Sequence, residues 1–288
     1  VDSLVGSEMC IRDRLIILII IFHSCEKVID IETEFDDKRL VIDANISKHR
    51  DSIDGIASVK LSETIPYFSD QESIVKNASV KIETNQIVYN LVYNNDKKEY
   101  SSIIENINKE EFVLSIIRNE NTYTSSEKLI TTPKIKSVIF GDRKSLNKDE
   151  VELRVTFIDP PEKGNYYLWK FGPKKSGKYD YLPALDKYIN GNEFTFSFFI
   201  DKTEYLQNSD FINIEINGIS ENYYNYLNIL TSQAGAQNGR PFSTSSSIIR
   251  GNISNLVSEE KFPLGYFRVY EFDYFRLSKD DAPDGVFD

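Results

Sequence analysis

A chain of 288 residues with 40% hydrophobic residues is long enough for one large or two medium domains, and its 18 Phe and 17 Tyr against 9 Pro argue against a disordered protein. The net charge of -11 would repel nucleic acid and anionic lipid, which are bound mainly by Lys and Arg, so no nucleic-acid partner is expected. The two cysteines, Cys10 and Cys25, precede the first strand pattern. The folded part is therefore expected to have no disulfide and no thiolate metal site.

A short apolar run lies close to the beginning of the chain. Residues 15–22 read LIILIIIF, which is too short to cross a bilayer but suits the apolar region of a signal peptide. Ser24 and Cys25 follow almost at once, so residues 15–24 resemble a lipoprotein signal peptide whose cysteine is lipidated. Residues 25–37 would then be a tether. The alternative is a buried N-terminal strand with an incidental cysteine.

Residues 1–14 resemble a translated sequencing-adapter tail, because residues 6–14 read GSEMCIRDR. These residues are therefore predicted to be non-native. The alternative is that Met9 is the true start, with Arg12 and Arg14 as the positive region of the signal peptide. Both alternatives give the same mature protein.

Hydrophobic and polar residues alternate between residues 40 and 128, as is typical of strands with one buried face. The predicted strands cover residues 40–46, 59–61, 80–82, 86–93, 112–116 and 122–128. Thr84 with Asn85, and residues 119–121, are predicted to be tight turns. About seven short strands in about 100 residues are the signature of an immunoglobulin-like sandwich, which is predicted for residues 38–133.

Thr131, Thr132 and Pro133 interrupt this pattern, and proline disfavours the continuation of a central strand. The sequence therefore predicts a domain boundary near Pro133. Alternation resumes over residues 151–157, 165–171, 194–198 and 212–216. Residues 134–288 are expected to form a larger β-sandwich or barrel-like domain with one short helix, which makes the whole chain mainly β.

The predicted helix begins at Ser220, a good capping residue, and ends near Gly235. The segment after it, residues 233–247, is rich in Gly, Ser, Asn and Gln and is long for a connection, which indicates either a mobile connector or a binding loop. If residues 233–247 are a binding loop, the partner surface would consist of this loop and the preceding helix. The candidate residues are Tyr223, Tyr226, Gln233, Gln237 and Arg240.

Gly172, Gly177 and Lys178 have the spacing of a phosphate-binding loop. Tyr179, however, stands where the Ser or Thr that holds magnesium should be, and no helix pattern follows. Residues 172–178 are therefore interpreted as a basic hairpin loop, and no nucleotide or other cofactor is expected.

Two further clusters have a structural explanation that we prefer. Four aspartates between residues 280 and 288 resemble the ligands of a calcium-binding loop. The Glu that ends such a loop is missing, so an acidic tail is the preferred interpretation. Tyr166, Tyr167 and Trp169 could stack on a sugar, but strand alternation sends neighbours to opposite faces, so at least part of this cluster is predicted to be core. No metal site is expected.

Catalysis is not expected either. His49 is the only histidine after the predicted signal peptide, in a polar stretch without a serine nucleophile motif, and is predicted to be solvated. A pair of carboxylates could hydrolyse a glycoside without histidine, but no spacing distinguishes a pair among 45 acidic residues. No catalytic residue is therefore assigned.

Several short segments follow one another in an order that is typical of one protein family. They are Cys25-Glu26-Lys27, Leu40-Val41-Ile42, Val59-Lys60-Leu61-Ser62, Asn77-Ala78-Ser79-Val80, Phe157-Ile158-Asp159-Pro160, Asn165-Tyr166-Tyr167-Leu168-Trp169, Gly251-Asn252-Ile253 and Leu264-Gly265-Tyr266-Phe267. On these segments the chain resembles, over residues 25–270, a family of Bacteroidota lipoproteins classed as domain of unknown function 4249. The resemblance implies an outer-membrane lipoprotein, often encoded beside a TonB-dependent receptor, with no established catalytic residues.

The expected function is accordingly that of a non-enzymatic outer-membrane lipoprotein, lipidated at Cys25, that assists a TonB-dependent receptor or captures its substrate. One alternative is a surface adhesin or glycan-binding module, indicated by the tandem β-domains and the aromatic residues. The other is a carboxylate-dependent hydrolase. The sequence does not identify the ligand.

Overall fold

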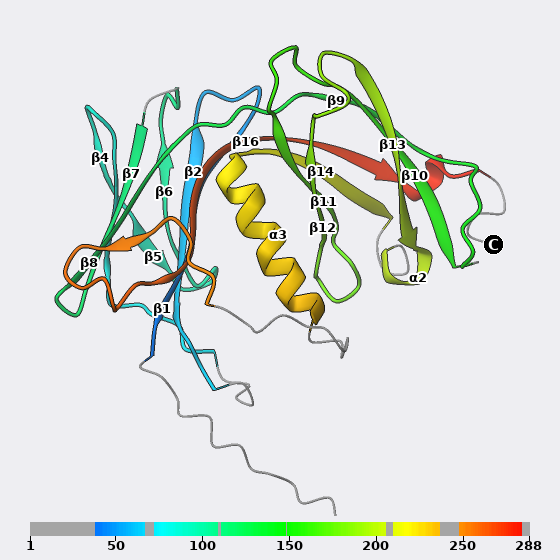
Figure 1. Cartoon of the computed structure of the whole chain (residues 1–288). Helices are drawn as coiled ribbons and strands as arrows, with labels where there is room; N and C mark the ends of the chain where they lie inside the picture. The colour runs from blue at the N-terminus through cyan, green and yellow to red at the C-terminus, as the bar shows by residue number, and fades with distance from the viewer. Residues whose placement is uncertain are drawn as a thin grey trace, which may run out of the picture. The chain divides into compact units, whose positions relative to one another are not determined.

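The computed structural model describes residues 38–66, 72–108, 111–147, 149–205, 210–236 and 248–283. The predicted signal peptide, Cys25 and the tether lie outside these residues, as do Gln237, Arg240 and the end of the acidic tail. Over the described residues the chain forms three β-sheets with two short helices, so the prediction of a mainly β protein is confirmed (Figure 1).

One half of the fold is a two-sheet sandwich, built mostly from residues 40–128. On one side lie β1 (Leu40–His49), β2 (Gly55–Glu63), β6 (Glu99–Ile104) and β5 (Val92–Asn94); on the other lie β15 (Ser254–Asn255), β8 (Asn121–Lys128), β7 (Glu111–Arg118), β3 (Ser79–Glu83) and β4 (Val88–Asn90). The alternating residues of both sheets, such as Ile42 and Ala44 facing Phe112 and Leu114, form one buried cluster. Alternation in the sequence thus corresponds to the two inner faces of a sandwich.

The second half pairs a different set of strands around a second buried cluster. A three-stranded sheet of β13 (Glu193–Asp201), β10 (Glu150–Ile158) and β9 (Ile135–Phe140) faces β12 (Asp180–Leu185), β11 (Tyr166–Gly172), β14 (Phe211–Ile219) and the end of β16 (Leu264–Ser278). This core is unusually aromatic, with Trp169, Tyr167, Phe157 and Phe171 all fully buried.

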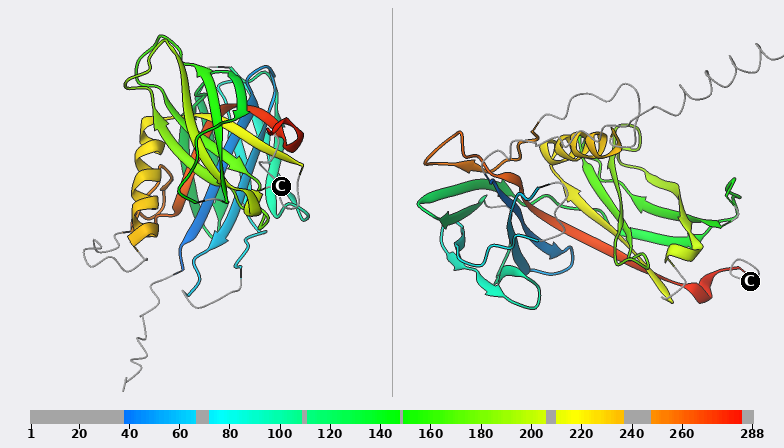
Figure 2. Two further views of the ribbon diagram at one scale, coloured as in Figure 1. Left: turned by 90° about the vertical axis from the view of Figure 1, so that its right-hand side faces the viewer. Right: turned by 90° about the horizontal axis from the view of Figure 1, so that it is seen from below.

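One strand belongs to both halves. β16 pairs in parallel with β1 from Leu264 to Phe272 and antiparallel with β14 from Phe272 to Ser278, so a single eight-stranded sheet runs through both halves (Figure 1; Figure 2, right). Phe267 lies in the first core and Leu277 in the second. The predicted boundary at Pro133 lies between Leu129, which packs against the first core, and Ile135, which lies in the second. Because the two cores share β16, independent folding of residues 38–133 stays a prediction.

Both predicted turns are formed, but one of the strands beside them differs from the prediction. Asn119 and Glu120 have positive φ angles of 45° and 63°, which suits the tight hairpin between β7 and β8. The hairpin at Thr84 also forms, since Thr84 N donates to Ile87 O at 2.9 Å. The single strand predicted over residues 86–93 is wrong, because buried Leu91 separates β4 in one sheet from β5 in the opposite sheet.

The predicted helix is confirmed as α3 (Glu221–Ala236), and Ser220 Oγ accepts a hydrogen bond from Tyr223 N at 3.2 Å, as a capping residue should. Tyr223 packs with Leu168, Ile219 and Tyr266. Because Leu168 alternates with the core residues Tyr167 and Trp169, α3 covers the sheet face that points away from the second core (Figure 2).

The second helix, α2 (Lys202–Tyr205), is a single turn that follows β13. Among the helices of the described segments, none has the length and apolarity needed to cross a membrane.

Candidate functional site

A column of aromatic rings fills the second core between β11 and the three-stranded sheet. Trp169 lies edge-to-face with Phe196 at 4.9 Å between ring centroids and with Phe157 at 5.3 Å, and Phe171 stacks on Phe198 at 3.7 Å. These rings come from alternate positions of three strands, so each strand presents its aromatic side chains to the same interior.

The column is incompletely covered along β13. Its core-facing residues Phe194, Phe196 and Phe198 stay partly exposed, whereas their cross-strand partners on β10, such as Val155 and Leu153, are fully buried. β13 and β12 each end their sheet, and in the described part of the chain no strand pairs with either outer edge. The second sandwich is therefore open between these two strands.

A pocket of about 310 Å³ occupies this open side. Its lining is aromatic and aliphatic throughout: Phe157, Tyr167, Trp169, Leu182, Ala184, Leu185, Tyr188, Ile189, Phe194 and Phe196. We call this the aromatic pocket. At its rim Tyr188 is 86% exposed, so its ring is accessible to a ligand. Pockets with such linings are the common sites for small or extended ligands.

Two buried carboxylates hold the rim formed by residues 186–192. Asp186 Oδ2 accepts hydrogen bonds from Gly164 N at 2.9 Å and Asn165 N at 3.0 Å. Asp159 Oδ1 accepts one from Tyr167 Oη at 2.7 Å, and Oδ2 accepts a longer one from Gly191 N at 3.4 Å. Burial raises the pKa of Asp159 and also that of Tyr167. The rim is thus attached to the pocket wall.

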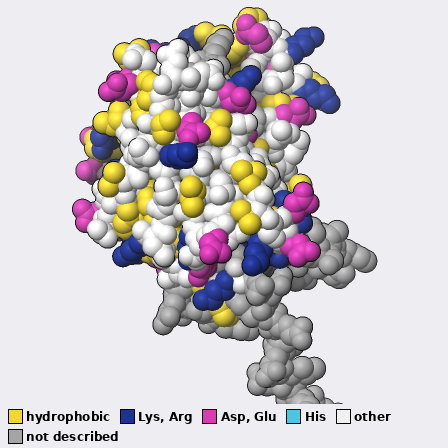
Figure 3. All heavy atoms as spheres, turned by 90° about the vertical axis from the view of Figure 1, so that its left-hand side faces the viewer, with side chains coloured by type: hydrophobic (Ala, Val, Ile, Leu, Met, Phe, Trp, Pro, Cys, Tyr) yellow, Lys and Arg dark blue, Asp and Glu magenta, His cyan; other side chains and the backbone are white. Residues whose placement is uncertain are grey.

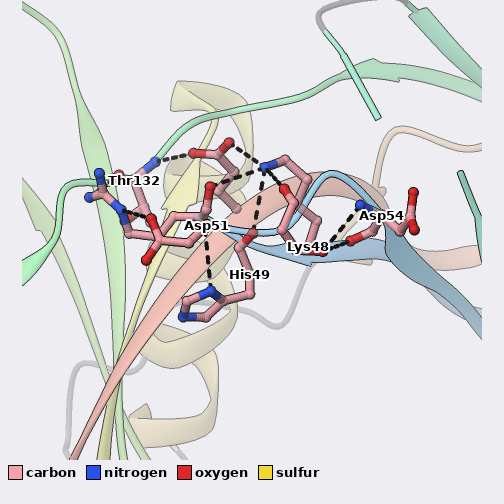
Figure 4. Close-up of polar contacts among 8 residues, drawn as sticks. Lys48, His49, Asp51, Asp54 and Thr132 are labelled. Carbon is pink, nitrogen blue, oxygen red and sulfur yellow. Dashed lines mark hydrogen bonds and ion pairs between the residues drawn. The ribbon is translucent and has the colours of Figure 1, made fainter. Parts of the chain in front are cut away.

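A polar cluster lies where the two halves join, at the end of β1 (Figure 4). Lys48 Nζ forms an ion pair with Glu271 Oε1 at 2.9 Å and donates to Ser52 O at 2.7 Å, and both charged side chains are largely buried. Thr132 N donates to Glu271 Oε2 at 3.4 Å. The cluster therefore connects β1, β16 and the segment after β8.

His49 belongs to this cluster, and its side chain is 32% exposed, so the prediction that it is solvated holds only in part. Its Nε2 lies 3.5 Å from Asp273 Oδ1, its Nδ1 accepts a hydrogen bond from Asp51 N at 3.3 Å, and its ring packs edge-to-face against Phe272 and Tyr274. Pairing of β1 with β16 brings these residues together, which a local sequence window does not indicate.

Of the residues predicted to form a partner surface, those that the structure describes are buried or half-buried. Tyr223 is buried, with its ring 4.8 Å from Tyr266 and the Arg268 guanidinium 5.0 Å from its centroid, so it packs α3 onto the sheet. Tyr226 and Gln233 are half-buried. Binding by α3 and residues 233–247 stays a prediction.

The other motifs lie where structural residues are expected, although Tyr167 and Trp169 also line the aromatic pocket. Residues 172–178 connect β11 to β12 as a hairpin. Tyr167 and Trp169 are buried, as the core interpretation predicted, while Tyr166 faces α3 and lies 5.1 Å from Tyr224. In the described ranges no three His, Cys, Asp or Glu side chains are grouped as metal ligands.

Two hollows are larger than the aromatic pocket but have more polar linings. One, of about 620 Å³, lies beside Arg143, Lys144 and Arg154, and the other, of about 610 Å³, lies along residues 132–136. On a different face, the one on the side of the first sandwich, Figure 3 shows Lys and Arg interspersed with Asp and Glu, without a concentrated basic area. Neither hollow shows the uncovered core residues that distinguish the aromatic pocket.

Two residues of the possible stacking cluster in the sequence, Tyr167 and Trp169, line the aromatic pocket, but the pocket itself was not predicted. The alternation of Phe194, Phe196 and Phe198 predicted a strand, but not that this strand lies at an unpaired edge. The usable signal was composition: three phenylalanines on one face are more apolar surface than a short strand can bury at the edge of a sheet.

Together these features define a mainly β protein with an aromatic pocket on the open side of its second sandwich. The chain belongs to the family described as Domain of unknown function (DUF4249), whose model matches residues 26–275. No curated protein matches the sequence. Among solved structures, the chain is similar to the chicken interferon gamma receptor alpha chain at 11% identity and a TM-score of 0.20, over 62% of this chain and 88% of that one.

Proposed function

We propose that this protein is a non-enzymatic outer-membrane lipoprotein, anchored through Cys25, that captures a ligand for a TonB-dependent receptor and holds an apolar part of that ligand in the aromatic pocket. The observation that carries the capture function is the pocket itself, where core-facing aromatic rings remain accessible at an open sandwich edge. The resemblance to lipoproteins encoded beside such receptors supports the anchor and the partner.

The lining favours an apolar group over a sugar ring. Hydroxyl groups occur on two lining residues, Tyr167 and Tyr188, and Tyr167 Oη already donates to Asp159. Each sugar hydroxyl buried without a partner costs about 1 to 3 kcal/mol, whereas each 100 Å² of apolar surface buried contributes about 2.5 kcal/mol. An apolar occupant is therefore the better match.

The single tryptophan of the chain, Trp169, lines the pocket and reports its occupancy directly. We expect the uncharged probe 4-phenylbutanol to change Trp169 fluorescence saturably. Tyr188→Ala removes a ring at the rim and should weaken binding about threefold to tenfold, the worth of one aromatic contact. Tyr181→Ala, an exposed tyrosine on the opposite face of β12, is the matched control and should bind as the wild type does. A probe that causes no saturable change, or a methyl glucoside that binds more tightly, contradicts the apolar pocket.

The anchor and the receptor are tested together in native membranes. The tagged wild-type protein should incorporate labelled palmitate and co-purify with a TonB-dependent receptor, whereas Cys25→Ala should lose the label and the membrane fraction. A labelled Cys25→Ala protein contradicts the anchor. A labelled wild-type protein without any receptor leaves the anchor intact and refutes the receptor partnership.

A further inference from the structure

The two strands that border the aromatic pocket differ in how their free edges are protected. β12 contains Pro183, which lacks an N–H group and prevents regular pairing with an incoming strand. β13 reads EFTFSFFID over nine residues, without proline and without a charged side chain between its two ends. Long apolar edge strands are normally protected by charged residues, proline or bulges, because their unpaired backbone groups can pair with a strand of another chain.

The geometry of β13 suits an extended segment. Side chains from Phe194 to Phe198 point alternately toward the pocket side and toward the outer face of the sheet. The side chains of a strand paired with β13 would alternate between the same two sides. Every second side chain of that strand would point toward Leu182 and Ala184 across the pocket, and the others would lie beside Thr195 and Ser197. A segment that alternates apolar and polar residues would place apolar side chains in the pocket and would also pair with the free backbone N–H and C=O groups of β13.

A second copy of this chain fits the edge less well. Antiparallel pairing of β13 with itself about Ser197 would place Glu193 opposite Asp201 at both ends of the ladder. Directly opposed like charges destabilise strand pairs. The register that pairs all nine residues is thus unfavourable for a second copy, which favours a partner of different sequence.

We infer that the free edge of β13 binds an extended segment of a partner protein by β-strand addition, with alternate apolar side chains of that segment in the aromatic pocket. This inference rests on the proposed capture function and specifies the chemical class of the ligand as peptide.

The test begins with a displayed library of nine-residue peptides in which threonine alternates with randomised Val, Leu, Ile or Phe. Selection on the purified wild-type protein should enrich members that change Trp169 fluorescence. The best peptide is then synthesised with N-methyl groups on either its odd or its even residues. Because only one edge of the peptide pairs with β13, one methylated form should bind at least about tenfold more weakly while the other keeps its affinity within about threefold.

Two variants of β13 provide the matched comparison. Phe194→Lys and Phe199→Lys change residues of nearly equal exposure, 38% and 37%, on the pocket face and the outer face respectively. Peptide binding should be lost in the first and kept in the second, with unchanged thermal unfolding confirming that both are folded.

The outcomes separate this inference from the proposed function. Equal binding of both methylated forms, or no enriched peptide, overturns strand addition; if 4-phenylbutanol still binds, the capture pocket stands. Failure of both probes refutes both. A wild-type dimer in light scattering that Phe194→Lys dissociates would make a second copy the occupant and overturn the inference as stated.

Discussion

Replacing Lys48 by methionine is expected to lower the free energy of unfolding by about 3 to 5 kcal/mol. Lys48 and Glu271 have side chains only 7% and 13% exposed, and their charged atoms lie 2.9 Å apart. The methionine variant would leave the Glu271 carboxylate buried without its counter-charge, and the carbonyl of Ser52 would lose its donor. The loss should appear as a lower midpoint in urea unfolding with an unchanged slope.

Two controls identify the cause of this loss. The exposed pair between Lys98 and Glu72, with nitrogen and oxygen 3.0 Å apart, should contribute less than about 1 kcal/mol, so Lys98→Met should unfold nearly as the wild type does. The double variant Lys48→Met with Glu271→Leu removes the unpaired charge and should recover most of the stability. A Lys48→Met protein within about 1 kcal/mol of wild type would show that the pair does not hold the junction.

Gly265→Ala is expected to destabilise the protein by about 3 kcal/mol or more. Gly265 lies where β16 begins to pair with β1, with φ of 102°, and an added Cβ would lie 2.0 Å from the carbonyl oxygen of Ile42. The methyl group therefore meets both backbone strain and a steric clash with backbone that cannot rotate away. Thermal and urea unfolding would measure the loss.

Gly164→Ala separates the two contributions. Gly164 also has a positive φ, of 87°, but nothing lies within 4 Å of an added Cβ. Only the backbone strain should remain, at about 1 to 2 kcal/mol. Equal losses at the two glycines would mean that the close approach of β16 to β1 contributes nothing.

Local patterns in the sequence were sufficient for most individual elements. Period-2 alternation located strands such as β7 and β10 because one buried face requires it, and Ser220 located the start of α3 because a helix leaves its first N–H groups unpaired. The resemblance to the DUF4249 family rested likewise on short segments, and the match over residues 26–275 confirmed it.

The features that the sequence could not supply depend on which strands become neighbours. Parallel pairing of β1 with β16 joins residues more than 200 positions apart, and it alone brings Lys48 to Glu271 and His49 to Asp273. The same pairing extends one sheet through both halves of the fold, which local alternation does not indicate. The aromatic pocket arises in the same way, because Phe194 and Phe196 stay partly exposed where β13 ends its sheet opposite β12. Alternation determines which face of a strand is apolar; only the tertiary structure decides whether another strand covers that face.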